Sequence, residues 1–248
     1  MKRIQFYLTP SEGKIQIGKA IATLPDILNA MKEHTVVVIA GTTNAPVAYE
    51  LLRLINHADQ FSHHHFFRGM TVPPGTNLKS EFMGDVIIKN GQWLYGKTIF
   101  DVENELGKDD IILKGANAVH LGDREAAVLL GHPKAGTSLP ILSAVYGRRA
   151  KLYVPVGCEK RVDQKLSVLA NMVNDKDTKG LRLLPLPGEI FTELDAIAAL
   201  THAKALIIGG GGVLGAEGGV YYMAQGTDEE LDLLQSIIKT IKEENNFW

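Results

Sequence analysis

The sequence predicts an α/β protein with a mostly parallel sheet flanked by helices and with an inserted β-hairpin. Two observations favour this fold class. Short apolar runs such as VVVIAG (36–41) alternate with helical stretches such as NAPVAYELLRLI (44–55). Runs without polar alternation are typical of strands covered on both faces, and strand–helix alternation favours parallel pairing. The hairpin is expected in GDVIIKNGQWLYG (84–96), because Asn-Gly at 90–91 indicates a tight turn.

The chain is expected to divide into an N-terminal helical segment, residues 1–34, packed on an α/β ligand-binding domain, residues 35–248. Thr9, Pro10 and Glu12 form the signature of a helix start, with a cap, a proline at the first position and a capping box. Residues 57–83 are expected to be irregular. Helices are expected at 10–24, 26–33, 44–55, 97–107, 136–149, 163–173, 192–203 and 227–244, and further strands at 109–115, 125–131, 151–157, 181–186, 203–210 and 219–226.

The composition argues against several classes of partner. The 248 residues carry a formal net charge of −2, so no broad basic field favours nucleic acid or a membrane surface, although local basic groups remain able to bind a small anion. No apolar run approaches the roughly 18 to 20 residues of a membrane span, and the N-terminus lacks the apolar core of a signal peptide. Cys158 is the single cysteine, which excludes an intramolecular disulfide and suits a reducing compartment. The expectation is a soluble, cytoplasmic protein.

A glycine run raises the question of a dinucleotide site. In IIGGGGVLGAE (207–217), Gly210, Gly212 and Gly215 satisfy G-x-G-x-x-G. A dinucleotide turn also requires a helix directly after the glycines, but two further glycines fall where that helix would begin, and the following GVYYMAQG is typical of a strand. We therefore expect no cofactor here. The glycines are expected either to let the backbone pass close to another segment or to line some other pocket.

The best candidates for a binding site follow buried strands, since ligands of α/β sheets gather at the carboxyl ends of strands. Gly41, Thr42, Thr43 and Asn44 join the first such strand to a helix. Glycine frees the turn, the threonines offer hydroxyls, and the amides at the helix start suit phosphate or carboxylate. An ordinary Thr/Asn helix cap is the alternative interpretation.

Two lysines are further candidates for binding an anion. Lys114 lies just beyond a buried strand, near Asn117, and Lys134 lies among turn residues ahead of a helix start at Gly136 and Thr137. A lysine beside a loop and a helix start suits an oxyanion, and a solvated surface lysine is the alternative interpretation.

Three other features have weaker functional interpretations. Cys158 stands close in sequence to Lys160 and Arg161, which would lower a thiol pKa, but a buried, inert thiol is the favoured interpretation. His63–His65 are consecutive, so their side chains diverge in extended backbone, and no metal site is expected. Glu217, the carboxylate inside the glycine run, is interpreted either as a nucleophile or base or as a turn cap.

Several of these motifs resemble those of the NagB/RpiA/CoA transferase-like superfamily. VVVIAGTTNAPVAYELL resembles the first strand, phosphate loop and helix of ribose-5-phosphate isomerase A. LKGANAV and GHPKAGT resemble the G-A-D-x-[IV] and N-K-x-G-T motifs of methylthioribose-1-phosphate isomerase and the related initiation-factor regulatory subunits. The order and rough spacing agree over residues 35–137. The superfamily also includes glucosamine-6-phosphate deaminase and the CoA transferases, and the resemblance implies a homo-oligomer.

The resemblance implies roles for particular residues. By position, Gly41, Thr42 and Thr43 match the phosphate-binding loop, Lys134 matches the lysine of the third motif, and Gly136-Thr137 match its G-T.

One position departs from the pattern of the isomerases. Asn117 stands where they have the catalytic aspartate, and an amide cannot take up the proton that isomerisation moves. Asp123, Glu125 and Glu217 are the candidates for a replacement base. CoA transferases of this fold use a glutamate near E-N-G or E-S-G to form a thioester, and Glu217-Gly218-Gly219 matches that pattern in part.

The leading prediction is a pocket for a phosphorylated sugar or a similar anionic metabolite, with aldose–ketose isomerisation through an enediol as its chemistry. A non-catalytic metabolite-binding or regulatory protein of the same fold is the first alternative, which Asn117 favours. A CoA transferase or CoA-ester hydrolase that uses Glu217 is the second.

Overall fold

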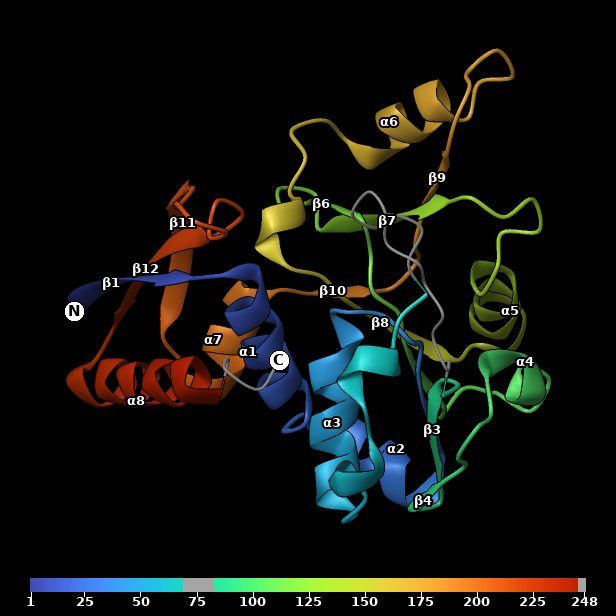
Figure 1. Cartoon of the computed structure of the whole chain (residues 1–248), viewed down its shortest axis with the longest axis horizontal. Coiled ribbons are helices and arrows are strands. Elements are labelled where there is room, and N and C mark those ends of the chain that lie inside the picture. Colours follow the sequence, from blue (N-terminus) through green and yellow to red (C-terminus); the bar gives the residue numbers. More distant parts are fainter. Residues whose placement is uncertain (69–82, 245–248) are drawn as a thin grey trace.

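The computed structural model describes residues 1–68 and 83–244 (Figure 1). Its largest sheet has six strands in the order β10-β8-β5-β2-β3-β4. Four of them are parallel neighbours: β10 (Glu189–Phe191), β8 (Lys151–Pro155), β5 (Ile111–Leu113) and β2 (Thr35–Val38). The coarse prediction of a mixed α/β protein with a mostly parallel central sheet flanked by helices is therefore confirmed.

The expected hairpin forms the antiparallel end of this sheet. It consists of β3 (Val86–Lys89) and β4 (Gln92–Trp93). The turn residues Asn90 and Gly91 have φ values of 50° and 77°. Positive φ at both central residues is what a type I′ turn requires, and Asn-Gly adopts it with little strain.

Two smaller antiparallel sheets complete the described fold. One has the order β6-β7-β9, from β6 (Ala118–His120), β7 (Glu125–Leu130) and β9 (Arg182–Pro185). The other has the order β1-β12-β11, from β1 (Lys2–Leu8), β12 (Val220–Gly226) and β11 (Lys204–Gly210).

Strand β1 corrects the purely helical interpretation of residues 1–34. Ile4, Phe6 and Leu8 alternate with other residues and belong to the core that β1 shares with β12 and helix α8 (Asp228–Glu244). This period of two is a strand pattern, which a search for a helical stripe overlooks. The N-terminus is thereby tied to the C-terminal part of the chain, as Figure 1 shows.

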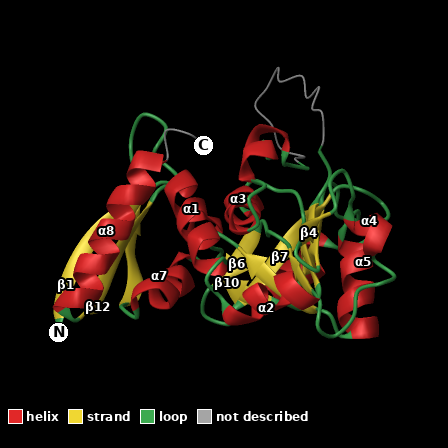
Figure 2. Ribbon diagram, turned by 90° about the horizontal axis from the view of Figure 1, so that it is seen from below, coloured by secondary structure: helices red, strands yellow, loops and turns green. Residues whose placement is uncertain are grey.

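Helices cover both faces of the central sheet (Figure 2). On one face, α1 (Pro10–Ile21), α2 (Pro25–Glu33) and α3 (Asn44–Leu54) share a core cluster with Val36 and Val38 of β2. On the other face, α4 (Ile99–Val102) and α5 (Ser138–Leu142) share a cluster with Val37. Helices α7 (Glu193–Thr201) and α8 pack on the β1-β12-β11 sheet, and α6 (Leu166–Val173) packs on β9.

Some predicted elements are shorter than the sequence indicated. Within 97–107, α4 is one turn with a capping box at its start, and within 136–149, α5 continues as the π-helical turn η3 (Ser143–Gly147). The expected irregular segment 57–83 includes the 3₁₀ turns η1 (Ala58–Gln60) and η2 (His63–His65), and its residues 69–82 lie outside the described residues. None of the helices in the described parts of the chain combines the length and apolar character needed to cross a bilayer.

The glycine run leads into a second strand instead of a helix. β11 extends through Gly209 and Gly210, and the chain then returns as antiparallel β12. The strand–glycine–helix geometry of a dinucleotide turn is therefore not formed. The glycines allow close approach instead, since a Cβ at Gly219 would overlap the Tyr7 hydroxyl, which donates a hydrogen bond to the carbonyl of Ala216 (2.5 Å).

Candidate functional site

A pocket of about 520 Å³ lies where β2 and β5 end. Its size is within the range of small-molecule sites. Parallel strands bring the loops after β2 and β5 to the same edge of the sheet, and β7 and the segment before α5 complete the walls. The lining comprises residues 39–43, 114–117, 128–132 and 135–138, together with Phe67, Arg68, Phe100, Lys160 and Leu181.

Backbone and side-chain hydrogen bonds fix the loop after β2. The side-chain Nδ2 of Asn44 donates to the carbonyls of Ile39 (2.8 Å) and Leu113 (3.0 Å), so Asn44 ties the end of β2 to the end of β5. The Gly41 carbonyl accepts the N–H groups of residues 44 and 45 and so begins α3. Asn44 is buried behind the pocket and supports its wall, and the hydroxyl-bearing Thr42 and Thr43 line it.

Lys114 brings a buried amine to this pocket. Its side chain is only 9% exposed, and its Nζ donates a hydrogen bond to Oγ1 of Thr137 (3.2 Å). The pKa of Lys114 is lowered to about 8: burial is the largest cause, the Asp85 carboxylate opposes it, and the positive charge of Arg68 adds a smaller lowering. Among the residues that the structure describes, no carboxylate forms an ion pair with Lys114. The amine therefore has unused capacity for an anion.

Lys160 brings a second largely buried amine. Its Nζ donates to Oγ1 of Thr43 (3.0 Å) and to the carbonyl of Ala116 (3.1 Å), and the Glu159 carboxylate lies 4.0 Å away. Burial lowers the pKa of Lys160, while Glu159 and Glu193 act to raise it.

Two more cations lie at the same end of the sheet. Lys14 of α1 reaches Oγ1 of Thr42 (3.4 Å). Arg68 lines the pocket, and its guanidinium contacts the wholly buried Asp85 (3.0 Å). Asp85 also accepts the N–H of Ala40 (2.9 Å) in the loop after β2, so the arginine is anchored to the pocket wall itself.

The balance of charge favours an anionic ligand. The described lining contains lysine, arginine and threonine side chains but no aspartate or glutamate. Positive groups in a partly buried cavity act through a lower effective dielectric and attract anions more strongly than surface lysines do. An apolar part of the wall faces the same cavity, formed by Phe67, Phe100, Val128, Leu129, Leu130 and Leu181.

The structure brings together most of the residues that the sequence predicted for a site. Seven of them line the pocket: Gly41, Thr42, Thr43, Lys114, Asn117, Gly136 and Thr137. Asn117 has a structural task as well, since its Oδ1 accepts the N–H of Leu129 (3.0 Å) and joins the loop after β5 to β7.

The other predicted residues lie outside the pocket lining. Lys134 is exposed in the loop before α5. Asp123 pairs with Lys165 (3.1 Å). Glu217 accepts the N–H of Gly215 (2.9 Å) within the β11–β12 loop. This contact is the one expected of a turn cap, the alternative to a nucleophile or base. The other candidate base, Glu125, accepts the N–H that begins α6 (3.2 Å).

Sequence reasoning missed three cations of the site: Lys14, Arg68 and Lys160. In the sequence, Lys160 stands out only as a neighbour of Cys158. Because it follows strand β8, the rule that ligands gather at strand ends could have found it. Cys158 is fully buried and burial raises its pKa, as an inert thiol requires.

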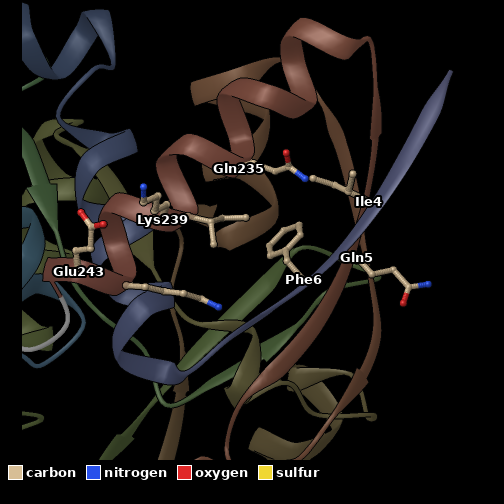
Figure 3. A pocket seen from close by; sticks show the side chains of 8 residues that line it. Ile4, Gln5, Phe6, Gln235, Lys239 and Glu243 are labelled. Atoms are coloured by element: carbon tan, nitrogen blue, oxygen red, sulfur yellow. The ribbon is translucent and has the colours of Figure 1, made fainter.

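A second hollow of about 470 Å³ lies between β1 and α8. Figure 3 shows Phe6 directed into it, with Lys239 and Glu243 of α8 along its side. Its charged side chains have both signs and lie on an exposed helix face. It contains none of the predicted site residues, so we do not regard it as the functional site.

Comparison with known proteins finds no matching family model, no matching curated protein and no matching solved structure.

Proposed function

We propose that this protein binds a small anionic metabolite, bearing a phosphate or carboxylate, in the pocket at the ends of β2 and β5. The observation that carries the proposal is the buried Lys114 amine, which contacts a threonine hydroxyl and forms no ion pair among the described residues. A buried ammonium group without a counter-ion is costly. A bound anion would supply the missing charge, and Lys160, Thr42 and Thr43 would share its oxygens.

A phosphorylated sugar is the ligand we favour, by the resemblance of the GTTN loop to the phosphate loop of sugar-phosphate isomerases. Isomerisation through an enediol would also need a base. Asp123 and Glu217 have partners elsewhere, and Asn117 cannot accept the proton. This arrangement supports the binding function more strongly than isomerisation, and it gives no support to a thioester on Glu217.

The test is binding of ribose 5-phosphate compared with ribose, by calorimetry and by thermal shift. A phosphorylated ligand at about 100 times its dissociation constant should add about 2.7 kcal/mol of stability. Lys160→Gln should weaken phosphate binding at least tenfold. Lys165→Gln is the matched control, because that lysine is 64% exposed and pairs with Asp123 away from the pocket.

Equal binding of ribose and ribose 5-phosphate, or an unchanged affinity in Lys160→Gln, would contradict the proposal. The same samples decide between enzyme and binding protein. NMR detection of ribulose 5-phosphate in the wild type would establish isomerisation, and binding without turnover would establish the non-catalytic alternative.

A further inference from the structure

The Lys114 amine is held in place by the sheet. Lys114 directly follows β5, and its backbone N–H donates to the carbonyl of Tyr153 in β8 (3.0 Å). Its side chain lines the pocket and ends at the Thr137 hydroxyl (3.2 Å). The amine therefore projects from a strand end whose position two neighbouring strands determine, which is the rigid support that a reacting group needs.

This environment also makes the amine chemically available. Because the pKa of Lys114 is lowered to about 8, a substantial part of this amine is neutral near neutral pH, whereas an ordinary lysine is almost wholly protonated there. The neutral amine has a lone pair, and desolvated lysines beside another cation are known nucleophiles toward carbonyl groups. Arg68 is such a neighbouring cation, and it also lines the pocket.

Lys160 differs from Lys114 in its partners. It donates to Thr43 and to the Ala116 carbonyl, and Glu159 lies 4.0 Å away, all of which stabilise the protonated form. The two buried lysines are therefore suited to different tasks. Lys160, with a nearby carboxylate and two acceptors, is suited to hold an anionic group, and Lys114, with one hydroxyl partner, is the amine that we expect to react.

We propose that Lys114 is a nucleophile that condenses with the carbonyl group of an anionic aldehyde or ketone held in this pocket. The inference rests on the proposed function of the pocket as an anion site. The Nζ lone pair attacks the carbonyl carbon, the C–N bond forms as the carbonyl π bond breaks, and the oxygen takes the proton that the nitrogen loses, which gives a carbinolamine. The hydroxyl then takes a proton from solvent and leaves as water, and the nitrogen lone pair forms the C=N bond of a protonated imine that joins the ligand to Lys114. The positively charged imine withdraws electrons from the adjacent carbon, so it supplies activation that the described part of the lining, which contains no carboxylate, otherwise lacks.

Three related probes separate the parts of the argument. Pyridoxal 5′-phosphate carries both phosphate and aldehyde, pyridoxal lacks the phosphate, and pyridoxine 5′-phosphate lacks the aldehyde. The protein is incubated with each probe below one equivalent, reduced with sodium borohydride and mapped by peptide mass spectrometry. We expect pyridoxal 5′-phosphate to label Lys114 first, pyridoxal to label it at least tenfold less, and pyridoxine 5′-phosphate to compete without being trapped. With limiting probe, labelling should rise as pH increases toward about 8, where the neutral amine becomes abundant while the anion site still holds the phosphate.

Lys114→Arg keeps the charge but cannot form the imine, and it should lose the preferred label. Lys165→Arg, at the exposed lysine, is the matched control and should label like the wild type. The peptide map of the wild type decides the question even where a variant fails to fold. Labelling spread evenly over exposed lysines, or first at Lys160, would overturn the inference.

The outcomes also distinguish the two proposals. Calorimetric binding of pyridoxine 5′-phosphate without preferred trapping of the aldehyde at Lys114 would refute the nucleophile and leave the anion site intact. Failure of both phosphorylated probes to bind would refute the anion site and the nucleophile together.

Discussion

Replacing Lys114 by methionine should stabilise the protein that contains no ligand. The folded pKa of about 8 lies 2.5 units below the ordinary 10.5 (10.5 − 8), which corresponds to a folding cost of about 3 kcal/mol. The sign follows from proton binding. Between pH 8 and 10.5 the unfolded chain holds more protons at this site, so stability rises with pH there, and the full cost applies below pH 8.

Methionine keeps most of the aliphatic volume and removes the charge. It also gives up the hydrogen bond to Thr137, which contributes about 1 kcal/mol. The expected net gain at pH 7 is therefore about 1 to 3 kcal/mol, and each kcal/mol corresponds to about 2 to 4 °C in Tm for a chain of this length. The gain should shrink at pH 10, where the wild-type amine is neutral.

The assay is urea unfolding of the wild type and Lys114→Met at pH 7 and pH 10, without phosphate in the buffer. Lys165→Met, at the exposed lysine, should change stability by less than about 0.5 kcal/mol. A Lys114→Met protein that is less stable than the wild type at pH 7, with a difference that does not depend on pH, would refute the reasoning.

Three further predictions concern other parts of the fold. Burial raises the pKa of Glu193 from 4.5 to about 7, so stability should fall as pH rises through this window, and Glu193→Gln should flatten that dependence in urea titrations from pH 4 to 8. Gly219→Ala forces a Cβ into the Tyr7 hydroxyl and should cost about 1 to 3 kcal/mol; an unchanged Tm would refute the overlap. Asp85→Asn weakens two backbone hydrogen bonds and the Arg68 pair and should cost about 3 kcal/mol or more; a loss below about 1 kcal/mol would show that these contacts are not stabilising.

The sequence predicts where buried strands end better than it predicts which distant segments pack around those ends. VVVIAG and the Ile-Ile-Leu run of DDIILKG are apolar because both faces of β2 and β5 are covered. That pattern also locates Gly41, Thr43 and Lys114 at one edge of the sheet. The helix start predicted at Thr137 or Ser138 agrees with the start of α5. These are local signals, which a sequence carries directly.

Other features depend on which distant segments meet. Lys160 lies after β8, 46 positions beyond Lys114 (160 − 114), and only the β5–β8 pairing brings the two lysines to one pocket. In the sequence, Lys134 is as good a candidate for an anion site as Lys114, but in the structure its side chain is exposed and lies outside the pocket lining. Burial, which lowers the lysine pKa values, is likewise a property of packing and not of any single motif.

Two other buried charged groups in the described fold form ion pairs. Glu50 contacts Lys19 and Arg53, and Asp85 contacts Arg68. Lys114 differs from them, because among the described residues its Nζ donates to a hydroxyl and forms no ion pair. Proteins keep costly groups of this kind chiefly where function requires them. An anion should therefore bind most tightly when Lys114 is charged, and binding should raise the pKa of that lysine and take up a proton.

This coupling gives the two proposals opposite dependences on pH. Anion affinity should fall as pH rises above about 8, where Lys114 loses its charge, although Lys160 preserves part of it. Imine formation needs the neutral amine and should increase over the same range. With limiting pyridoxal 5′-phosphate, borohydride trapping at Lys114 should therefore pass through a maximum near pH 8. If trapping instead rises steadily up to pH 10.5, the Lys114 amine reacts without help from the anion site. The trapping of an isolated lysine increases with pH in that way, because it depends only on the fraction of neutral amine.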